Sequence, residues 1–196
     1  MRSPLSESAL AQLFTEARSH HHFRPDPVSD ETLHTLYELC KWGPTSVNSN
    51  PARILYIRSA AEKERLVPHL LGSNVEQVRA APVVAIVAYD AHFLDQITRL
   101  FPAVDVRPYF AGNEGLIHDT AFRNSTLQGA YFIMAARALG LDVCPMSGFN
   151  NAGVDEAFFQ DRGWRSNFLC TLGYGDETRL FPRGPRLSFS EACDIV

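Results

Sequence analysis

Apolar positions recur along the chain at helical spacing in some segments and in continuous runs in others, which predicts a domain of mixed helices and strands. Helical spacing predicts three helices that cover Leu5–Arg18, Ala61–Leu71 and residues 119–139, followed by a short helix at Val154–Gln160. Ser29 is typical of an N-cap, and the helix that it begins should extend to Cys40 and stop before Pro44. Continuous apolar runs predict strands at residues 53–58, 82–89 and 166–172.

Two of these elements should form the centre of the fold. The run over 82–89 is apolar throughout, which is typical of a central strand covered on both faces. The helix over 119–139 has apolar residues around most of its circumference, so we expect it to be buried nearly all round and to end at Gly140. Residues 100–115 predict a mobile excursion, residues 145–149 a turn, and residues 179–186 an irregular basic segment.

Composition narrows the class of protein. The chain has 196 residues, of which 45% are hydrophobic and 20% charged, so we expect a single domain over residues 1–196. A net charge of -4 gives no general attraction to nucleic acid or to anionic membranes. The longest apolar run, over residues 80–89, is too short to span a bilayer, and residues 1–7 lack the pattern of a secretory signal. We therefore expect a cytoplasmic protein with no nucleic-acid or membrane partner.

Most familiar catalytic motifs are absent from the sequence. It contains no phosphate loop, no HExxH zinc motif, no GxSxG nucleophile elbow and no complete dinucleotide fingerprint. The triplet His20–His22 does not indicate a metal site, because adjacent histidines on a regular element cannot all reach one ion. The four cysteines, which lie far apart, should be buried or partly buried free thiols: Cys40, Cys144, Cys170 and Cys193.

Basic residues at the two ends of the chain suit an anionic ligand. Arg18 with Ser19 follows the first helix, and Arg183 and Arg186 lie near the C-terminus. Guanidinium groups bind phosphate with two parallel hydrogen bonds, so both ends of the chain together could hold one phosphate. The alternative is that these arginines only solvate surface loops. The polar segment Pro44–Pro51 has an equally ordinary explanation as a turn.

Taken in order along the chain, these segments resemble the FMN-dependent nitroreductase superfamily. Residues 44–51 (PTSVNSNP) resemble its P-[ST]-S-x-N-x-Q-P segment, and Arg18–Ser19 resembles its opening phosphate-binding region. Residues 145–149 (PMSGF) are similar to its flavin loop, and residues 173–176 and 182–186 to its closing strand and basic tail. Within the superfamily, residues 41–46, 120–125 and 186–189 look most like the malonic-semialdehyde reductase branch of pyrimidine catabolism.

The resemblance implies an α+β domain, with a mixed central sheet flanked by helices, that forms an intertwined homodimer with FMN at the subunit interface. The residues that it assigns to the FMN phosphate are Arg18, Ser19, one of His20 and His21, Arg183 and Arg186. Those that it assigns to the flavin ring are Asn74, Gln77, Pro145, Met146, Ser147 and Gly148 from one subunit, with Pro44, Thr45, Ser46 and Asn48 from the partner. Family members commonly carry a lysine where Gln77 stands, and an amide there would lower the reduction potential of the flavin.

The chemistry implied by the resemblance needs neither a catalytic side chain nor a metal. FMN would accept a hydride from NADH or NADPH and pass it to an acceptor in a ping-pong cycle. The acceptor would be a small aldehyde such as malonic semialdehyde, giving 3-hydroxypropanoate. The alternatives are a nitroreductase or quinone reductase of broad range, or a flavin-binding protein without catalysis. Phe101, Tyr109 and Phe110 are candidates for a substrate lid or for simple packing, and Arg123 for steering a carboxylate or for a solvated surface position.

Overall fold

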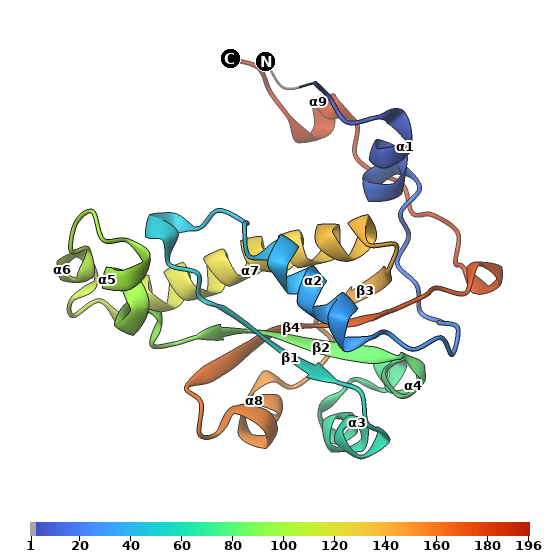
Figure 1. Cartoon of the computed structure of the whole chain (residues 1–196), viewed down its shortest axis with the longest axis horizontal. Helices are drawn as coiled ribbons and strands as arrows, with labels where there is room; N and C mark the ends of the chain where they lie inside the picture. The colour runs from blue at the N-terminus through green and yellow to red at the C-terminus, as the bar shows by residue number, and fades with distance from the viewer. Residues whose placement is uncertain (1–2) are drawn as a thin grey trace.

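The computed structural model describes residues 3–196; Met1 and Arg2, part of the N-terminal segment considered above, lie outside this range. A four-stranded sheet forms the centre, in the order β1 (Ala52–Ile57), β2 (Val83–Asp90), β4 (Trp164–Gly173) and β3 (Asp142–Met146). All three strand pairings are antiparallel, and an isolated parallel bridge joins Ser19 to Val143. Helices cover both faces of the sheet (Figure 1). The expected α+β class is therefore confirmed.

Strand β2 is the buried centre of the sheet, as its apolar sequence predicts. Side chains along a strand alternate between the two faces. Val83 and Ala85 accordingly pack into one hydrophobic cluster, and Val84, Ile86 and Ala88 into another. Because both faces of the sheet are covered, β2 needs apolar residues at nearly every position, and Asp90 is its only residue that is not buried.

Helices α2 (Asp30–Cys40) and α7 (Glu114–Ala138) cover one face of the sheet. Ser29 caps α2 as expected, because its hydroxyl accepts a hydrogen bond of 3.1 Å from the backbone N–H of Thr32. The expectation that α7 is buried nearly all round is wrong. The sheet covers only one side of the helix, so Phe122 on one flank and Leu127 and Tyr131 on the other are 45%, 48% and 44% exposed. Leu127 and Tyr131, four residues apart, form a partly exposed apolar strip on one flank.

Three shorter helices lie on the opposite face: α3 (Ala60–Leu66), α4 (Gly72–Ala80) and α8 (Asn151–Phe159). The 3-10 turn η3 (Val67–His69) follows α3. The single helix expected over residues 61–71 is wrong at its C-terminal end. Pro68 lacks a backbone N–H, and the chain tightens there into the 3-10 turn. Helix α4 was not predicted, because polar residues such as Asn74 and Gln77 interrupt its apolar spacing.

The N-terminal helix is shorter than expected. Helix α1 (Glu7–Leu10) continues into a π-helical turn, η1 (Ala11–Thr15), which ends before Arg18. The turn is tied to Arg137, since the Gln12 side chain donates to the carbonyl of Arg137 and the Arg137 guanidinium donates to the backbone carbonyl of Leu13. The expectation of a helix up to Arg18 is therefore wrong.

The segment before α7 folds into short turns around a small core of its own. It comprises η4 (Phe93–Gln96), α5 (Ile97–Leu100) and α6 (Arg107–Phe110). Phe93, Ile97, Val106 and Phe110 are buried together with Tyr89 and Ala121. The interpretation of residues 100–115 as a simple excursion is thus incomplete, since aromatic packing gives the segment helical structure.

The ends of the last elements agree only in part with the sequence. Gly140 has a φ of +75°, which fits the expected left-handed end of α7. Pro145 belongs to strand β3 rather than to a turn, a position that proline tolerates because β3 is an edge strand. Beyond β4 the chain forms η5 (Glu177–Arg179) and α9 (Phe189–Ala192), and every residue of the tail, 181–196, is exposed.

Three of the four cysteines are buried in the fold. Cys40, Cys144 and Cys170 are buried free thiols, whereas Cys193 is exposed, so the expectation is wrong for Cys193, which lies on the exposed tail. None of the helices described is both long and apolar enough to cross a membrane. Residues 3–196 bring together no three histidine, cysteine, aspartate or glutamate side chains that could hold a metal ion.

Candidate functional site

Strand β3 brings the two ends of the chain together. The segment Arg18–His21 runs beside β3, where the backbone N–H of His20 donates to the carbonyl of Val143 over 3.3 Å. The Arg18 guanidinium donates to the carbonyl of Phe181. In return, the Arg183 guanidinium donates to the carbonyl of Ala17 over 3.1 Å. Two arginines that are 165 positions apart in the sequence (183 minus 18) therefore occupy one region.

These two arginines carry uncompensated positive charge. Within residues 3–196, no carboxylate oxygen lies within 4.0 Å of Arg18 or Arg183, so only neutral carbonyls accept their hydrogen bonds. Burial lowers the pKa of the nearby Arg137, and the positive charge of Arg183 adds to this effect, while Asp142 opposes it. The region therefore favours an anion.

His20 and His21 have different surroundings. The His20 ring is buried, its Nδ1 lies 3.2 Å from the Asp142 carboxylate, and it packs against Gly175 so closely that a Cβ there would overlap the ring. His21 is half-buried, and its Nε2 lies 4.0 Å from the Cys144 sulfur. The ring of His21 also meets Phe181 edge to face, at a centroid distance of 5.2 Å. His21 thus lies beside the carbonyl partner of Arg18, whereas His20 points into the protein.

Helix α4 places two amide side chains against β3 and β4. Asn74 and Gln77 are one turn apart and therefore share a face of the helix. Asn74 Nδ2 donates to the carbonyl of Gly148 over 2.9 Å, and Gln77 Nε2 donates to the hydroxyl of Thr171 over 2.8 Å. A Cβ at position 148 would come within 2.7 Å of the Asn74 amide, so the close approach requires glycine.

The segment that follows β3 leaves backbone donors free. Pro145 and Ser147 are exposed, whereas Met146 is buried in the hydrophobic cluster below the sheet. The carbonyls of Ser147 and Gly148 accept bonds from Phe149 and Leu71, but their own N–H groups donate to no acceptor in the described chain. We call this whole set the β3 cluster: residues 18–21, Asn74, Gln77, residues 145–148 and Arg183.

The loop Pro44–Asn50, which we call the strained loop, has an unusual backbone. Val47, Asn48 and Asn50 have φ values of 46°, 50° and 42°. Asparagine tolerates this left-handed region, but for a β-branched residue such as Val47 it is a genuine outlier. Such strain persists only where the surrounding structure imposes it, and it concentrates at functional sites.

Two amides of α7 hold the strained loop in place. Asn124 Oδ1 accepts the backbone N–H of Ser46 over 2.8 Å. Gln128 accepts the N–H of Ala52 over 2.9 Å and donates to the side chain of Asn50 over 3.2 Å. Both amides are buried and lie four residues apart. Sequence analysis did not identify them as site residues; two buried amides at helical spacing were the available signal.

The strained loop and the β3 cluster lie apart in the chain. In Figure 1 the loop precedes β1 at the end of the molecule that holds α5 and the start of α7, whereas β3 lies beyond the last turns of α7. No hydrogen bond joins the two within residues 3–196. The predicted residues therefore form two groups: the β3 cluster on one side and Pro44, Thr45, Ser46 and Asn48 on the other. Arg186 belongs to neither, because its guanidinium bonds the carbonyls of Gly184 and Pro185 in the exposed tail.

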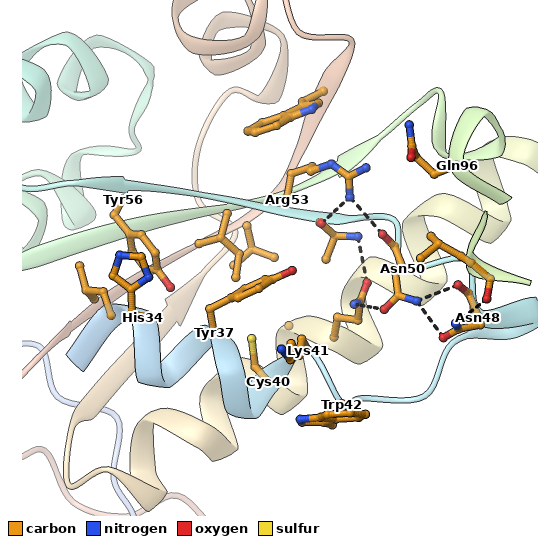
Figure 2. Close-up of a pocket in the computed structure, with 18 of the residues that line it drawn as sticks. His34, Tyr37, Cys40, Lys41, Trp42, Asn48, Asn50, Arg53, Tyr56 and Gln96 are labelled. Atoms are coloured by element: carbon orange, nitrogen blue, oxygen red, sulfur yellow. Dashed lines mark hydrogen bonds between the residues drawn. The ribbon is translucent and has the colours of Figure 1, made fainter. Parts of the chain in front are cut away.

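A cavity of about 920 Å³ lies between α2 and the edge strand β1 (Figure 2). Asn48 is the only predicted site residue in its lining, which is otherwise formed by side chains such as Tyr37, Arg53 and Tyr56. The buried Tyr56 hydroxyl has no hydrogen-bond partner within the described residues, and burial raises its pKa. The outer edge of β1, which forms one side of this cavity, pairs with no other strand among the described residues.

The candidates for a lid and for substrate steering differ in how exposed they are. Phe110 is buried against Phe93 with its ring edge to face at 5.8 Å, so it serves packing. Phe101 is half-buried against the same small core. Tyr109 is 75% exposed, and Arg123 is exposed with no carboxylate within 4.0 Å among residues 3–196. Tyr109 and Arg123 thus remain accessible to a ligand.

Comparisons with known proteins agree with this architecture. The nitroreductase family model matches residues 15–174. Proteins provisionally named NADH dehydrogenase/NAD(P)H nitroreductase are 53% identical in Rhodopseudomonas palustris and 54% identical in Polynucleobacter asymbioticus, each over 196 residues and the whole of both chains. A provisionally named nitroreductase from Exiguobacterium sibiricum, solved in complex with FMN, superposes with a TM-score of 0.85 over the whole of both chains at 21% identity. The family match and the two close relatives show that this chain belongs to the nitroreductase family.

Proposed function

We propose that the protein is an FMN-dependent NAD(P)H oxidoreductase. The observation that carries the proposal is the β3 cluster, in which Arg18 and Arg183 meet without a carboxylate partner. Arg18 precedes Ser19, which bridges to Val143 of β3, and the free N–H groups of Ser147 and Gly148 follow the end of the same strand. The two arginines suit a phosphate. The two free N–H groups suit a planar ring with several carbonyl and nitrogen acceptors. The names of the close relatives and the FMN held by a protein of the same fold support this assignment.

The residues present fit FMN on chemical grounds. Arg18, Ser19 and Arg183 would hold the phosphate through charge-assisted hydrogen bonds, which are about twice as strong as neutral ones. Between the two histidines, His21 is the better placed donor, because His20 is buried against Asp142. Asn74, Gln77 and the N–H groups of residues 147–148 would hold the ring. When bound, FMN supplies two-electron hydride transfer, and the protein orients it and excludes water.

The second half of the site would come from another copy of the chain in a homodimer. The strained loop is remote from the β3 cluster within one chain. Its backbone is strained, yet within residues 3–196 it forms no hydrogen bond with the β3 cluster. Apolar side chains that a dimer would bury are exposed on α7 and on the tail: Phe122, Leu127, Tyr131, Phe181, Leu187 and Phe189. The tail of a second copy, which carries Arg186, would cover the cavity beside β1. Such an isologous pair would contain two equivalent ring sites, each completed by the strained loop of the other copy.

For the acceptor we propose a small aldehyde acid such as malonic semialdehyde. The support is the resemblance of residues 41–46, 120–125 and 186–189 to the malonic-semialdehyde reductase branch, together with Arg123, an exposed guanidinium free to pair with a carboxylate. A nitro or quinone acceptor is the second candidate, favoured by the names of the close relatives. Since NADH and NADPH are the proposed reductants, we place the enzyme in the cytoplasm.

The test begins with the visible spectrum of the purified protein before and after anaerobic NADH or NADPH, with the released chromophore identified by mass. We expect about one FMN per chain, bleached by reduced nicotinamide. A colourless protein that takes up no added FMN contradicts the proposal. Values of kcat/KM for malonic semialdehyde and for a nitroaromatic then separate the two acceptors, because discrimination is a ratio of these constants.

A further inference from the structure

The two amides of α4 have a defined orientation, because their partners accept but do not donate. An amide side chain has a donor end and an acceptor end, and its partners decide which end faces them. The carbonyl of Gly148 is an acceptor only, so Asn74 must turn its NH₂ group toward it, over 2.9 Å. The Oδ1 atom of Asn74 therefore points the other way.

Gln77 is oriented by a buried relay of hydrogen bonds. The hydroxyl of Thr171, which is fully buried, donates to the carbonyl of Cys144 over 3.5 Å. Because a hydroxyl has a single proton, the oxygen of Thr171 is left to accept from Gln77 Nε2, over 2.8 Å. The Cys144 thiol has a second contact with the same amide: burial raises the pKa of Cys144, and a hydrogen bond from Gln77 offsets part of that effect. The NH₂ group of Gln77 thus points into the protein.

Both amides consequently leave their oxygen atoms free. Within residues 3–196, neither Asn74 Oδ1 nor Gln77 Oε1 accepts a hydrogen bond. The two residues are one turn apart on α4 and share a face, so both free acceptors belong to the side of α4 that carries them. No lysine or arginine lies between them on the helix, whose intervening residues are Val75 and Glu76.

We propose that Thr171 is a positioning residue that fixes Gln77 so that bound FMN meets two amide oxygens and no cation at α4. The inference rests on the proposed function. An acceptor pair favours an N–H group of the ligand and disfavours added negative charge on it, whereas a lysine would do the opposite. Reduction adds electron density to the flavin, so this arrangement weakens binding of reduced FMN relative to oxidised FMN and lowers the midpoint potential.

The test removes the hydroxyl that fixes the amide. In Thr171→Val, Gln77 is free to turn its NH₂ group outward, and we expect reduced FMN to gain about tenfold in affinity relative to oxidised FMN. For a two-electron couple this corresponds to a rise of about 30 mV in midpoint potential. Thr171→Ser restores the hydroxyl and should match the wild type, and Gln77→Lys should shift the potential further in the same direction. An unchanged potential in Thr171→Val overturns the inference.

A matched control and a second measurement separate this inference from the proposed function. Thr120→Val also removes a buried threonine hydroxyl, but on α7, and should leave the potential unchanged. In the protein without FMN, the Gln77 side-chain NH₂ resonances should exchange slowly in wild type and Thr171→Ser, and rapidly in Thr171→Val. Equal exchange in all three overturns the positioning role even where FMN binds. A wild type with a protected Gln77 amide that takes up no FMN contradicts the proposed function instead.

Discussion

The β3 cluster and the strained loop differ in what a single chain completes. The β3 cluster is assembled within one chain, because a β-bridge brings Ser19 beside Val143 and an Arg183 hydrogen bond joins the tail to Ala17. The strained loop is also held within one chain, by two buried amides of α7. Within residues 3–196, however, no hydrogen bond joins it to the β3 cluster. Each region keeps a feature that costs free energy, unpaired charge in one and backbone strain in the other.

The difference indicates how the two regions work together. Unpaired guanidinium groups are stabilised by an anion, and a strained backbone is retained where it serves a ligand. The apolar strip of Leu127 and Tyr131 lies next to the strained loop in the fold, since the neighbouring α7 residues Asn124 and Gln128 bond the loop and Ala52. Association through that strip would carry the strained loop of one copy to the β3 cluster of the other.

The largest effect is expected from breaking the proposed association. Leu127→Asp places a charge on a side chain that is 48% exposed in the single chain and far from the β3 cluster. Burying a leucine contributes about 1.5–3 kcal/mol, and an isologous interface buries it twice, so the dimer should weaken by about 10²- to 10⁴-fold. Sedimentation velocity would show a monomer, and FMN stoichiometry should fall with it.

The control for that variant is Val104→Asp, which introduces the same charge at an exposed apolar position on the segment before α7. It should leave both mass and FMN content unchanged. A Leu127→Asp protein that stays dimeric and fully loaded would show that the strained loop and the β3 cluster do not meet through α7.

The next largest effect concerns the β3 cluster alone. Arg18→Ala removes one charge-assisted fork, worth about 1.5–3 kcal/mol, so FMN should bind about 10- to 100-fold more weakly. Quenching of FMN fluorescence measures this affinity directly. Arg179→Ala removes an exposed arginine of η5 that bonds no predicted residue, and should have little effect. Equal losses in both variants would mean that general charge, rather than the β3 cluster, holds the ligand.

A smaller effect is expected from loosening the strained loop. Asn124→Ala leaves the backbone N–H of Ser46 without its acceptor, which should cost about 1–3 kcal/mol of stability. For a chain of this size, each kcal/mol lowers Tm by about 2–4 °C. Asn167→Ala is the matched control, because its amide bonds the same helix but not the loop. FMN affinity should fall only in Asn124→Ala; a loss in both would indicate that α7, and not the loop, is disturbed.

Sequence patterns predicted those parts of the fold that a local signal determines. The apolar run of β2, the Ser29 cap and the left-handed Gly140 each depend on a few neighbouring residues, and all are present. Helix α4 escaped prediction because it carries the polar face of the candidate site, so its apolar periodicity is weak. The same conflict between local pattern and function hid strand β3, whose proline is tolerated only at a sheet edge.

For the site residues too, sequence predicted what a local motif carries and missed what depends on contacts between distant segments. The motif segments around Arg18, residues 145–148 and Arg183 were predicted from their resemblance to family motifs. The structure places Arg18 and Arg183 in one region and Ser19 beside β3, which residues 147–148 follow. The residues that position them could not be found in this way. Thr171 and Asn124 lie within ordinary buried elements, and only the fold reveals that their polar groups meet Gln77 and Ser46.

The smallest expected effect is a change in how stability depends on pH. It compares two buried thiols, Cys40 beside the cavity at β1 and Cys144 on β3. Cys40 lies in the wall of the cavity beside β1, where burial raises its pKa from 9.0 to about 11. An unfolded thiol ionises near pH 9 while the folded one stays neutral, so the contribution of the neutral thiol is complete below pH 9. It is lost as pH rises through 11, at no more than about 1.4 kcal/mol per pH unit.

Urea unfolding between about pH 8 and pH 10.5 measures this loss, in a Cys193→Ala background that prevents exposed thiols from cross-linking. Cys40→Ala should be less stable at pH 8, since it leaves a small void, but its stability should fall less steeply with pH than that of the parent. Cys144→Ala should change the slope less, because the hydrogen bond from Gln77 offsets part of the burial that raises the pKa of Cys144. Parallel pH curves for Cys40→Ala and its parent would mean that water or another group stabilises the Cys40 thiolate, and that the cavity beside β1 is more open than its buried thiol indicates.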